Sequence, residues 1–275
     1  MGAVRRRLVL WFSILASLYV VLVLVLALCQ DTLVFPGAGR GVRELPADLH
    51  GVEQGRLVRP DGGEFRIAIA ASVGPARAVA VYFVGNGEDL QSAAYGAAML
   101  AQYGLVVIGV EHPGYGSSQG PPSVATLLGS AEVAAQFGRS KAQQLGVPLV
   151  AIGSSLGTFC AVHLASRQLV DRMLLRAPPT SMLAAAQRQF WWLPVRLLLR
   201  HRFDNLAVAP QVRCPVLVLH GDRDHVVPLD LGQQLCAAFA GEKQLIVAHG
   251  CDHNDLPLER SGPYGQQIAA FLGAR

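Results

Sequence analysis

Several signatures of known function classes are missing from this chain of 275 residues. It has no Cys-x-x-Cys pair, and its 8 histidines are not clustered at the spacing of metal ligands. The 5 cysteines do not form a disulfide framework, because Cys214 and Cys251 are expected a full strand length apart, at opposite ends of neighbouring strands. The sequence therefore indicates neither a metal site nor a disulfide-stabilised fold, and it does not indicate a cofactor.

Acidic residues are missing from residues 1–29, and this distorts the overall charge. Arg5, Arg6 and Arg7 supply three of the positive charges behind the formal net charge of +4. From residue 30 onward, 20 basic residues (the 23 of the chain less these three) face 19 acidic ones. No basic stripe remains outside the N-terminus, so we exclude nucleic acid as a partner.

Charge of either sign is absent from residues 8–28, which form one apolar run. Its 21 residues match the roughly 20 that a helix needs to cross a bilayer core. A cleavable signal peptide has an apolar region of about 7–15 residues and ends at small residues, whereas Leu28 stands where a small residue is needed. We therefore expect residues 1–29 to be an uncleaved single-pass anchor, with a removed signal peptide as the alternative. The arginines before the span predict that the remaining domain lies on the periplasmic or extracellular side.

The remaining residues, 30–275, predict one α/β domain. Residues 30–49 predict an irregular linker, and residues 56–59 and 64–70 predict an antiparallel hairpin around a turn at 60–63. Apolar runs without alternation, typical of strands buried on both faces, occupy 78–84, 105–110, 149–152, 173–175, 216–219 and 244–248. Helical patterns lie at 89–103, 123–145, 156–168, 229–240 and 260–272. This order predicts a mostly parallel central sheet covered by helices on both faces.

One insertion breaks the alternation of strands and helices. Residues 179–210 occupy the place of a single crossover helix, and Pro194 divides them into at least two helices. An insertion at this end of the sheet predicts a helical cap over the site. Its tryptophans, Trp191 and Trp192, either face lipid headgroups together with nearby arginines or pack onto the domain and line an acyl pocket. We favour the second interpretation.

The pattern around Ser155 is the most informative in the chain. Of the two adjacent serines Ser154 and Ser155, only Ser155 has glycine both two residues before it and two residues after it, at Gly153 and Gly157. An apolar run precedes the motif and a helical pattern follows it, which is the context of the G-x-S-x-G nucleophile turn. Glycine is needed on both sides because a sharp strand-to-helix turn brings neighbouring backbone close. Ser155 is therefore the predicted nucleophile.

A serine hydroxyl needs a base to take its proton and an acid to orient that base. In chains with a G-x-S-x-G nucleophile turn, the acid follows the serine in the sequence and the histidine follows the acid, each at the end of a later strand. The loop after 216–219 offers Asp222 and Asp224, and the loop after 244–248 offers His249 and His253. The pattern alone leaves both choices open.

The two loops read H-G-x-x-D-x-x-V-P (220–228) and G-x-x-H-N-D (250–255) and follow G-x-S-x-G. With these motifs the chain resembles the α/β-hydrolase superfamily, and more closely its membrane-anchored serine hydrolases of the abhydrolase-domain type, in the serine aminopeptidase-like branch. The resemblance covers essentially residues 30–272. It implies that Asp224 is the acid and His253 the base, and it leaves Asp222 and His249 supporting or incidental.

Two backbone N–H groups should bind the oxyanion of the reaction. One belongs to Leu156, the residue after the nucleophile, and the other to the loop at 84–87, where we expect Asn86 rather than its neighbour Gly87 to donate. The sequence departs from the family here, because histidine usually precedes the Gly-Asn pair and this chain has Val84. His112 is expected to shape a turn rather than to catalyse.

These residues predict a serine hydrolase of the carboxylesterase or lipase type that acts on an ester or related acyl bond of a hydrophobic or lipid-like substrate. A serine peptidase of the aminopeptidase type has the same fold and triad, but it needs an acidic site for a free amine, whereas the cap is basic. A non-catalytic binding protein with this fold is the alternative from another class. The expected partners are a small acyl substrate and the membrane.

Overall fold

The computed structural model describes residues 2–41, 45 and 49–273. In this part of the chain one eight-stranded sheet forms the centre, in the order β1-β2-β4-β3-β5-β6-β7-β8. The hairpin β1 (Val52–Val58) and β2 (Glu64–Ala70) is antiparallel, and β2 pairs antiparallel with β4. The other strands pair in parallel: β3 (Ala78–Phe83), β4 (Leu105–Val110), β5 (Leu149–Ser154), β6 (Arg172–Arg176), β7 (Val216–Gly221) and β8 (Lys243–Ala248). The predicted mostly parallel sheet is confirmed.

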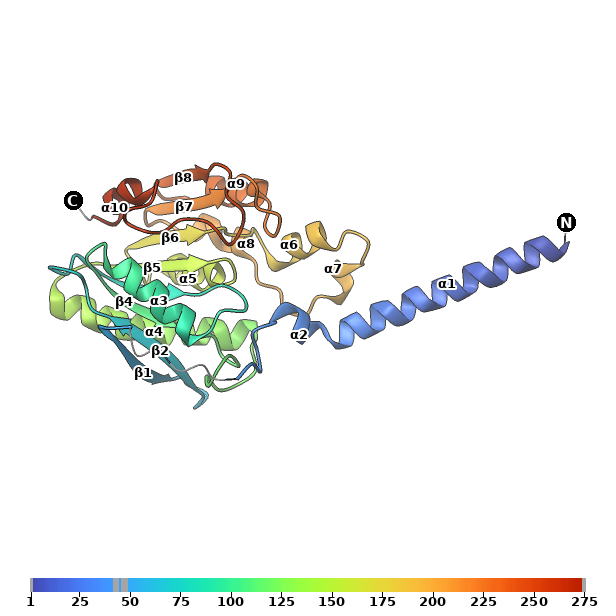
Figure 1. Cartoon of the computed structure of the whole chain (residues 1–275), viewed down its shortest axis with the longest axis horizontal. Helices are drawn as coiled ribbons and strands as arrows, with labels where there is room; N and C mark the ends of the chain where they lie inside the picture. The colour runs from blue at the N-terminus through green and yellow to red at the C-terminus, as the bar shows by residue number, and fades with distance from the viewer. Residues whose placement is uncertain (1, 42–44, 46–48, 274–275) are drawn as a thin grey trace.

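Helices cover both faces of this sheet (Figure 1). They are α3 (Leu90–Ala101), α4 (Val124–Leu145), α5 (Gly157–Ser166), α9 (Leu229–Ala238) and α10 (Gly265–Leu272). Side chains alternate along each strand, so Val79 and Val81 pack in the cluster with α4, α5 and α9, whereas Ala80 and Tyr82 pack in the cluster with α3 and α10. Burial on both faces explains why the strand sequences are apolar without alternation.

The N-terminal helix α1 (Gly2–Leu28) is continuous, and none of its residues is buried. It extends away from the domain (Figure 1). With a mean hydropathy of 2.7 and 27 residues it fits a membrane-spanning helix.

The expected irregular linker over residues 30–49 is wrong for its first part. Residues Gln30–Val34 form helix α2, and the side chain of Phe35 is fully buried. Its ring lies edge-on to His201 at a centroid distance of 4.8 Å. Burial of this large apolar side chain stabilises the packing of the segment against the domain. Residues 42–44 and 46–48 of the same stretch lie outside the described residues.

The insertion between β6 and β7 forms the helical cap. Its elements are α6 (Met182–Gln189), α7 (Val195–Leu198), α8 (Asn205–Val208) and the 3-10 turn η1 (Ala209–Gln211). Pro194 immediately precedes α7 and separates it from α6, as predicted. The favoured packing of both tryptophans onto the domain is wrong for Trp191, which is 82% exposed, while Trp192 is 42% exposed and lines a cavity. In Figure 1, α6 and α7 lie beside the junction of α1 and α2.

Candidate active site

Ser155 lies on the sharp turn between β5 and α5. Its φ of +47° is in the left-handed region, which a serine adopts only under strain. A Cβ atom on Gly153 would lie 2.6 Å from Gly157 O, and one on Gly157 would lie 2.2 Å from Phe83 O. The backbone therefore leaves no room for a side chain at either flanking position, as the sequence pattern predicted. The turn presents the Ser155 hydroxyl at the carboxyl end of the sheet.

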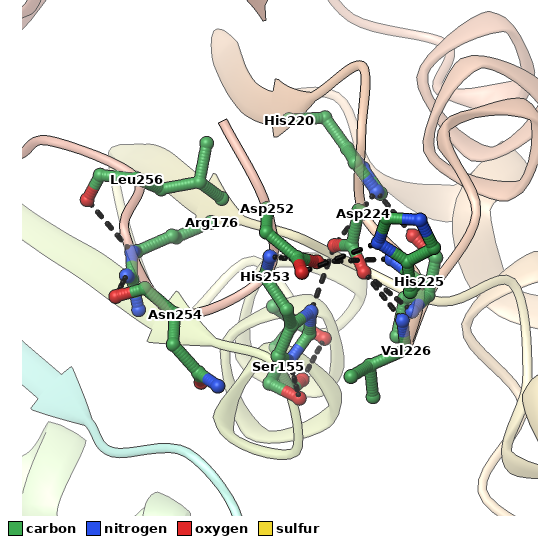
Figure 2. A network of polar contacts seen from close by, with 12 residues as sticks. Ser155, Arg176, His220, Asp224, His225, Val226, Asp252, His253, Asn254 and Leu256 are labelled. Atoms are coloured by element: carbon green, nitrogen blue, oxygen red, sulfur yellow. Dashed lines mark hydrogen bonds and ion pairs between the residues drawn. The ribbon is translucent and has the colours of Figure 1, made fainter. Parts of the chain in front are cut away.

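Two hydrogen bonds connect Ser155, His253 and Asp224 (Figure 2). His253 Nε2 lies 2.9 Å from Ser155 Oγ, and His253 Nδ1 lies 2.7 Å from Asp224 Oδ2. An ionised carboxylate can only accept, so Nδ1 carries the proton of the neutral ring and Nε2 presents its lone pair to the hydroxyl. This is the protonation state that a base acting on Ser155 requires.

The alternative acid and histidine form a separate pair. Asp222 Oδ2 lies 2.9 Å from His249 Nδ1, and the His249 side chain is 82% exposed. This hydrogen bond is the main reason why the pKa of the Asp222 carboxyl lies below its ordinary value. Neither residue lines the cavity at Ser155. Of the four candidates that the pattern alone left open, the structure brings Asp224 and His253, the pair that the resemblance implied, to the serine and keeps the other two apart from it.

The loop expected to supply the second oxyanion donor is held at three points. His112 Nε2 lies 2.9 Å from Val84 O, Tyr115 Oη donates to Asn86 Oδ1 at 2.6 Å, and Asn86 Nδ2 donates to Val34 O at 2.6 Å. Burial lowers the pKa of His112 to about 4, so the ring is neutral near pH 7. His112 thus supports the loop from behind rather than facing Ser155.

Asn86 and Leu156, the two expected oxyanion donors, line the same cavity as Ser155 and His253. Among the described residues, neither backbone N–H has a protein acceptor. The cavity has a volume of about 580 Å³, and most of its lining is apolar. Polar side chains contributed by Glu88, Arg176 and Asn254 also border it. The two N–H groups are therefore free to bind an oxygen of a molecule in this cavity.

Comparison with known proteins identifies the fold. A profile of the alpha/beta hydrolase fold matches residues 81–206. An uncharacterized protein of Mycobacterium tuberculosis is 33% identical over 174 residues, and this match spans 63% of the chain and 62% of that relative's length. The alpha/beta hydrolase domain-containing protein 17B of Homo sapiens is 25% identical over 189 residues, covering 68% of the chain and 64% of that protein. The chain has the α/β-hydrolase fold.

Solved structures of esterases share this fold. An esterase of Pyrococcus furiosus superposes with a TM-score of 0.68 at 14% sequence identity, covering 86% of this chain and 96% of that one. An esterase of Thermogutta terrifontis superposes with a TM-score of 0.60 at 21% identity, covering 86% and 94%. At these identities the likeness establishes the α/β-hydrolase fold.

The surroundings of Asp224 were missed by the sequence reasoning. In this α/β-hydrolase chain, Asp224 Oδ1 accepts from the backbone N–H groups of Val226 at 2.9 Å and Val227 at 2.7 Å. His220 Nε2 lies 3.4 Å from Oδ2 and 2.7 Å from Val227 O. Burial by itself raises the pKa of this carboxyl, but the hydrogen bonds from His220 and His253 outweigh it and hold the pKa well below the ordinary value. Asp224 is therefore ionised at neutral pH despite its burial.

Tyr115 was also missed as a support of the Asn86 loop. The sequence contains it in the run Pro113-Gly114-Tyr115-Gly116, but nothing local indicates that its hydroxyl reaches a residue 29 positions earlier. Likewise, the contribution of α1 and α2 to the cavity wall has no signal in the sequence, because an apolar span looks the same whether or not it borders a site.

Proposed function

We propose that this α/β-hydrolase superfamily member is a serine hydrolase that cleaves an ester or related acyl bond through an acyl-enzyme on Ser155. The observation that carries the proposal is the pair of hydrogen bonds from Ser155 Oγ to His253 and from His253 to the buried carboxylate of Asp224. The strained backbone of Ser155 costs stability, and such strain is typical of functional sites. The stability of the fold therefore does not explain why these three side chains adopt this geometry.

In the first half of the reaction, Ser155 Oγ attacks the acyl carbonyl carbon while His253 Nε2 takes the hydroxyl proton. The electron pair of the carbonyl bond moves to the oxygen, and the N–H groups of Leu156 and Asn86 bind the resulting oxyanion. The oxyanion then re-forms the carbonyl, the bond to the leaving alcohol breaks, and His253 gives its proton to that alcohol. Asp224 stabilises the charged imidazole in between.

In the second half, water replaces the alcohol. His253 Nε2 takes a proton from the water as its oxygen attacks the acyl carbon, and a second oxyanion binds to the same two N–H groups. When this intermediate collapses, the bond to Ser155 Oγ breaks and His253 returns a proton to the serine. The products are a carboxylic acid and the free enzyme, and no cofactor takes part.

The lining of the cavity favours a hydrophobic acyl group over a peptide. Leu193, Val195 and Leu199 of the cap are among its apolar lining residues. A peptidase of the aminopeptidase type needs an acidic group for the substrate amine, and Glu88 is the acidic residue in the lining. Its Oε2 already accepts from Gly85 N–H, and the Arg176 guanidinium in the same lining opposes a cationic substrate. A carboxylesterase or lipase fits this site better.

The proposal includes a retained anchor, with residues 8–28 across the membrane and the catalytic domain on the non-cytoplasmic side, as the arginines at positions 5–7 favour. Protease protection in sealed vesicles tests this topology. The domain should be digested from the non-cytoplasmic face alone.

Labelling of the full-length chain with a fluorophosphonate probe tests the nucleophile. The probe should label the wild type, and Ser155→Ala should abolish the labelling. Ser154→Ala is the matched control, because Ser154 is the buried neighbour that the G-x-S-x-G register assigns to the spacer position, and this variant should still be labelled. A folded wild type that the probe does not label, or a Ser155→Ala variant that it does, contradicts the proposal and favours a binding role.

A further inference from the structure

Part of the wall of the cavity at Ser155 comes from the N-terminal helix. Leu22 and Leu26 of α1 line this cavity together with Phe190 and Trp192 of the cap. Both leucines belong to the apolar run with the length of a bilayer span. Leu22 is also 44% exposed, so the cavity lining continues onto the outer surface of the anchor. A site for a water-soluble substrate needs no wall of this kind.

The cap runs alongside the last turns of this helix. Tyr19 Oη donates to the backbone oxygen of Trp192 at 2.8 Å. Tyr19 precedes Leu28, the last residue of α1, by nine positions, which is about 14 Å along a helix and almost half of a hydrocarbon core of about 30 Å. With α1 across a bilayer, the cap loop at Trp192 therefore lies within the leaflet on the side of the domain.

The anchor and the cap are joined by a buried amide. The Gln30 side chain is buried, and its Nε2 donates to Ala27 O at 2.9 Å and to Leu198 O at 3.0 Å. Its Oε1 accepts from the backbone N–H of Arg200 at 2.8 Å. One turn of α1 and two residues of the cap are thus held by one side chain whose amide donates twice and accepts once. This junction fixes the cavity relative to the membrane span.

The outer surface of the cap fits contact with lipid. Trp191 is 82% exposed and Leu197 is 83% exposed, and burying such side chains stabilises a protein–membrane contact. Arg196 and Arg200 lie between and beside them on the same short segment. Arg200 donates to Ala27 O near the end of α1, the level expected for the lipid headgroups, whereas Trp191 lies next to Trp192 and its bond to Tyr19, deeper in the leaflet.

We propose that the cavity opens sideways into the leaflet between α1 and the cap, and that the substrate is a long-chain acyl ester resident in the same membrane. Its chain slides along Leu22 and Leu26 while its ester group reaches Ser155, so the anchor is a wall of the acyl-binding site as well as a tether. This inference rests on the proposed serine hydrolase activity, and it names the substrate class and its route.

The test uses the full-length chain in phosphatidylcholine vesicles and two fluorogenic substrates, a palmitate ester and a water-soluble acetate ester. The palmitate ester is placed either in the vesicles that carry the enzyme or in separate vesicles at the same total concentration. Lateral entry predicts at least about tenfold faster hydrolysis in the shared vesicles, because a palmitoyl chain leaves a bilayer reluctantly. Equal rates in the two arrangements overturn the proposal.

A matched pair of variants tests the wall itself. Leu22→Trp places a larger ring on the cavity lining, whereas Leu24→Trp makes the same change at an exposed position of α1 outside it. Leu22→Trp should lower the ratio of palmitate to acetate hydrolysis about tenfold, the effect of keeping two methylene groups from burial. Leu24→Trp should leave both rates at the wild-type level. An unchanged ratio in Leu22→Trp overturns the proposal.

These outcomes are distinguishable from a failure of the proposed function. If the wild type hydrolyses neither ester and resists the fluorophosphonate probe, the serine hydrolase activity itself is wrong. If it hydrolyses acetate normally but shows no preference for palmitate in its own vesicles, the activity stands and lateral entry is wrong.

Immersion of the cap has an independent readout in the fluorescence of Trp191. In a Trp11→Phe, Trp192→Phe background, Trp191 is the remaining tryptophan of the 3 in the chain. Phosphatidylcholine brominated on the upper part of its acyl chains should quench its emission when the protein is in vesicles. Emission that such lipids leave unchanged overturns the membrane-facing position of the cap.

Discussion

Replacement of Asp224 by asparagine tests the triad most directly, because its surroundings determine how an amide would be oriented. Asp224 Oδ1 accepts from the N–H groups of Val226 and Val227 at 2.9 and 2.7 Å, and Oδ2 accepts from His253 Nδ1 at 2.7 Å. In Asp224→Asn the amide oxygen must remain toward the two backbone N–H groups, since an NH₂ group there would bring donors against donors. The NH₂ group then faces His253 Nδ1.

A donor at that place moves the imidazole proton from Nδ1 to Nε2. His253 Nε2 lies 2.9 Å from Ser155 Oγ and in this tautomer can no longer take the hydroxyl proton. The wrong tautomer in a Ser-His-Asp triad lowers kcat about 10⁴-fold, or about 5.5 kcal/mol of transition-state stabilisation. The shape of the side chain barely changes, so the variant should still fold.

The assay is hydrolysis of the acetate ester by the full-length chain in detergent, with thermal unfolding measured in parallel. Asp222→Asn is the matched control, because Asp222 is bonded to the exposed His249 instead of His253. It should change kcat by less than about threefold, since exposed pairs contribute little. A folded Asp224→Asn variant that keeps more than a tenth of the wild-type kcat would refute the assignment of the triad.

Three further predictions follow from the loop behind the oxyanion site and from the nucleophile turn. Burial lowers the pKa of His112 from 6.5 to about 4. Between these two pH values the imidazole is protonated in the unfolded state and neutral in the folded state, so the folded state loses stability as the pH falls below 6.5. The free energy of unfolding should therefore drop by about 2 kcal/mol from this residue between pH 7 and pH 5, and urea titrations should show a smaller drop in His112→Gln. Gly157→Ala should yield little folded protein and no fluorophosphonate labelling, since its Cβ would lie 2.2 Å from Phe83 O; a soluble, labelled variant would contradict the described turn. Tyr115→Phe removes the 2.6 Å hydrogen bond to Asn86 Oδ1 and should lower kcat for the acetate ester about three- to tenfold, the range of one hydrogen bond, whereas an unchanged kcat would show that the loop does not need this support.

The fold was predictable because its signals are local. Each buried strand, such as Ala78–Phe83, is an apolar run without alternation, which follows from burial on both faces. The sharp turn at Ser155 was predictable for a similar reason, because the two glycines that the turn demands stand within two residues of Ser155. The hairpin and the cap were likewise located from turn residues and from Pro194. The helix expected over 260–272 begins only at Gly265, after a turn whose closure the pattern did not show.

The first segment after α1 was the main error of the sequence interpretation. Proline and glycine at positions 36–41 suggested an irregular linker, yet Phe35 is fully buried and Gln30 joins α1 to the cap. Both contacts reach across the chain, with Gln30 and Leu198 separated by 168 positions. The composition of a short segment carries no information about a partner that lies so many positions away in the sequence.

The sequence by itself determined the order of strands and helices, the turn that carries Ser155 and the apolar span of residues 8–28, because each depends on neighbours along the chain. The tertiary structure alone decided how Asp224, 29 positions from His253, reaches that ring while Asp222 turns to His249. It also decided that α1 borders the cavity of a serine more than a hundred positions away. Both outcomes depend on how strand ends and loops pack in space, and a backbone shift of one hydrogen-bond length would change them without changing any local pattern.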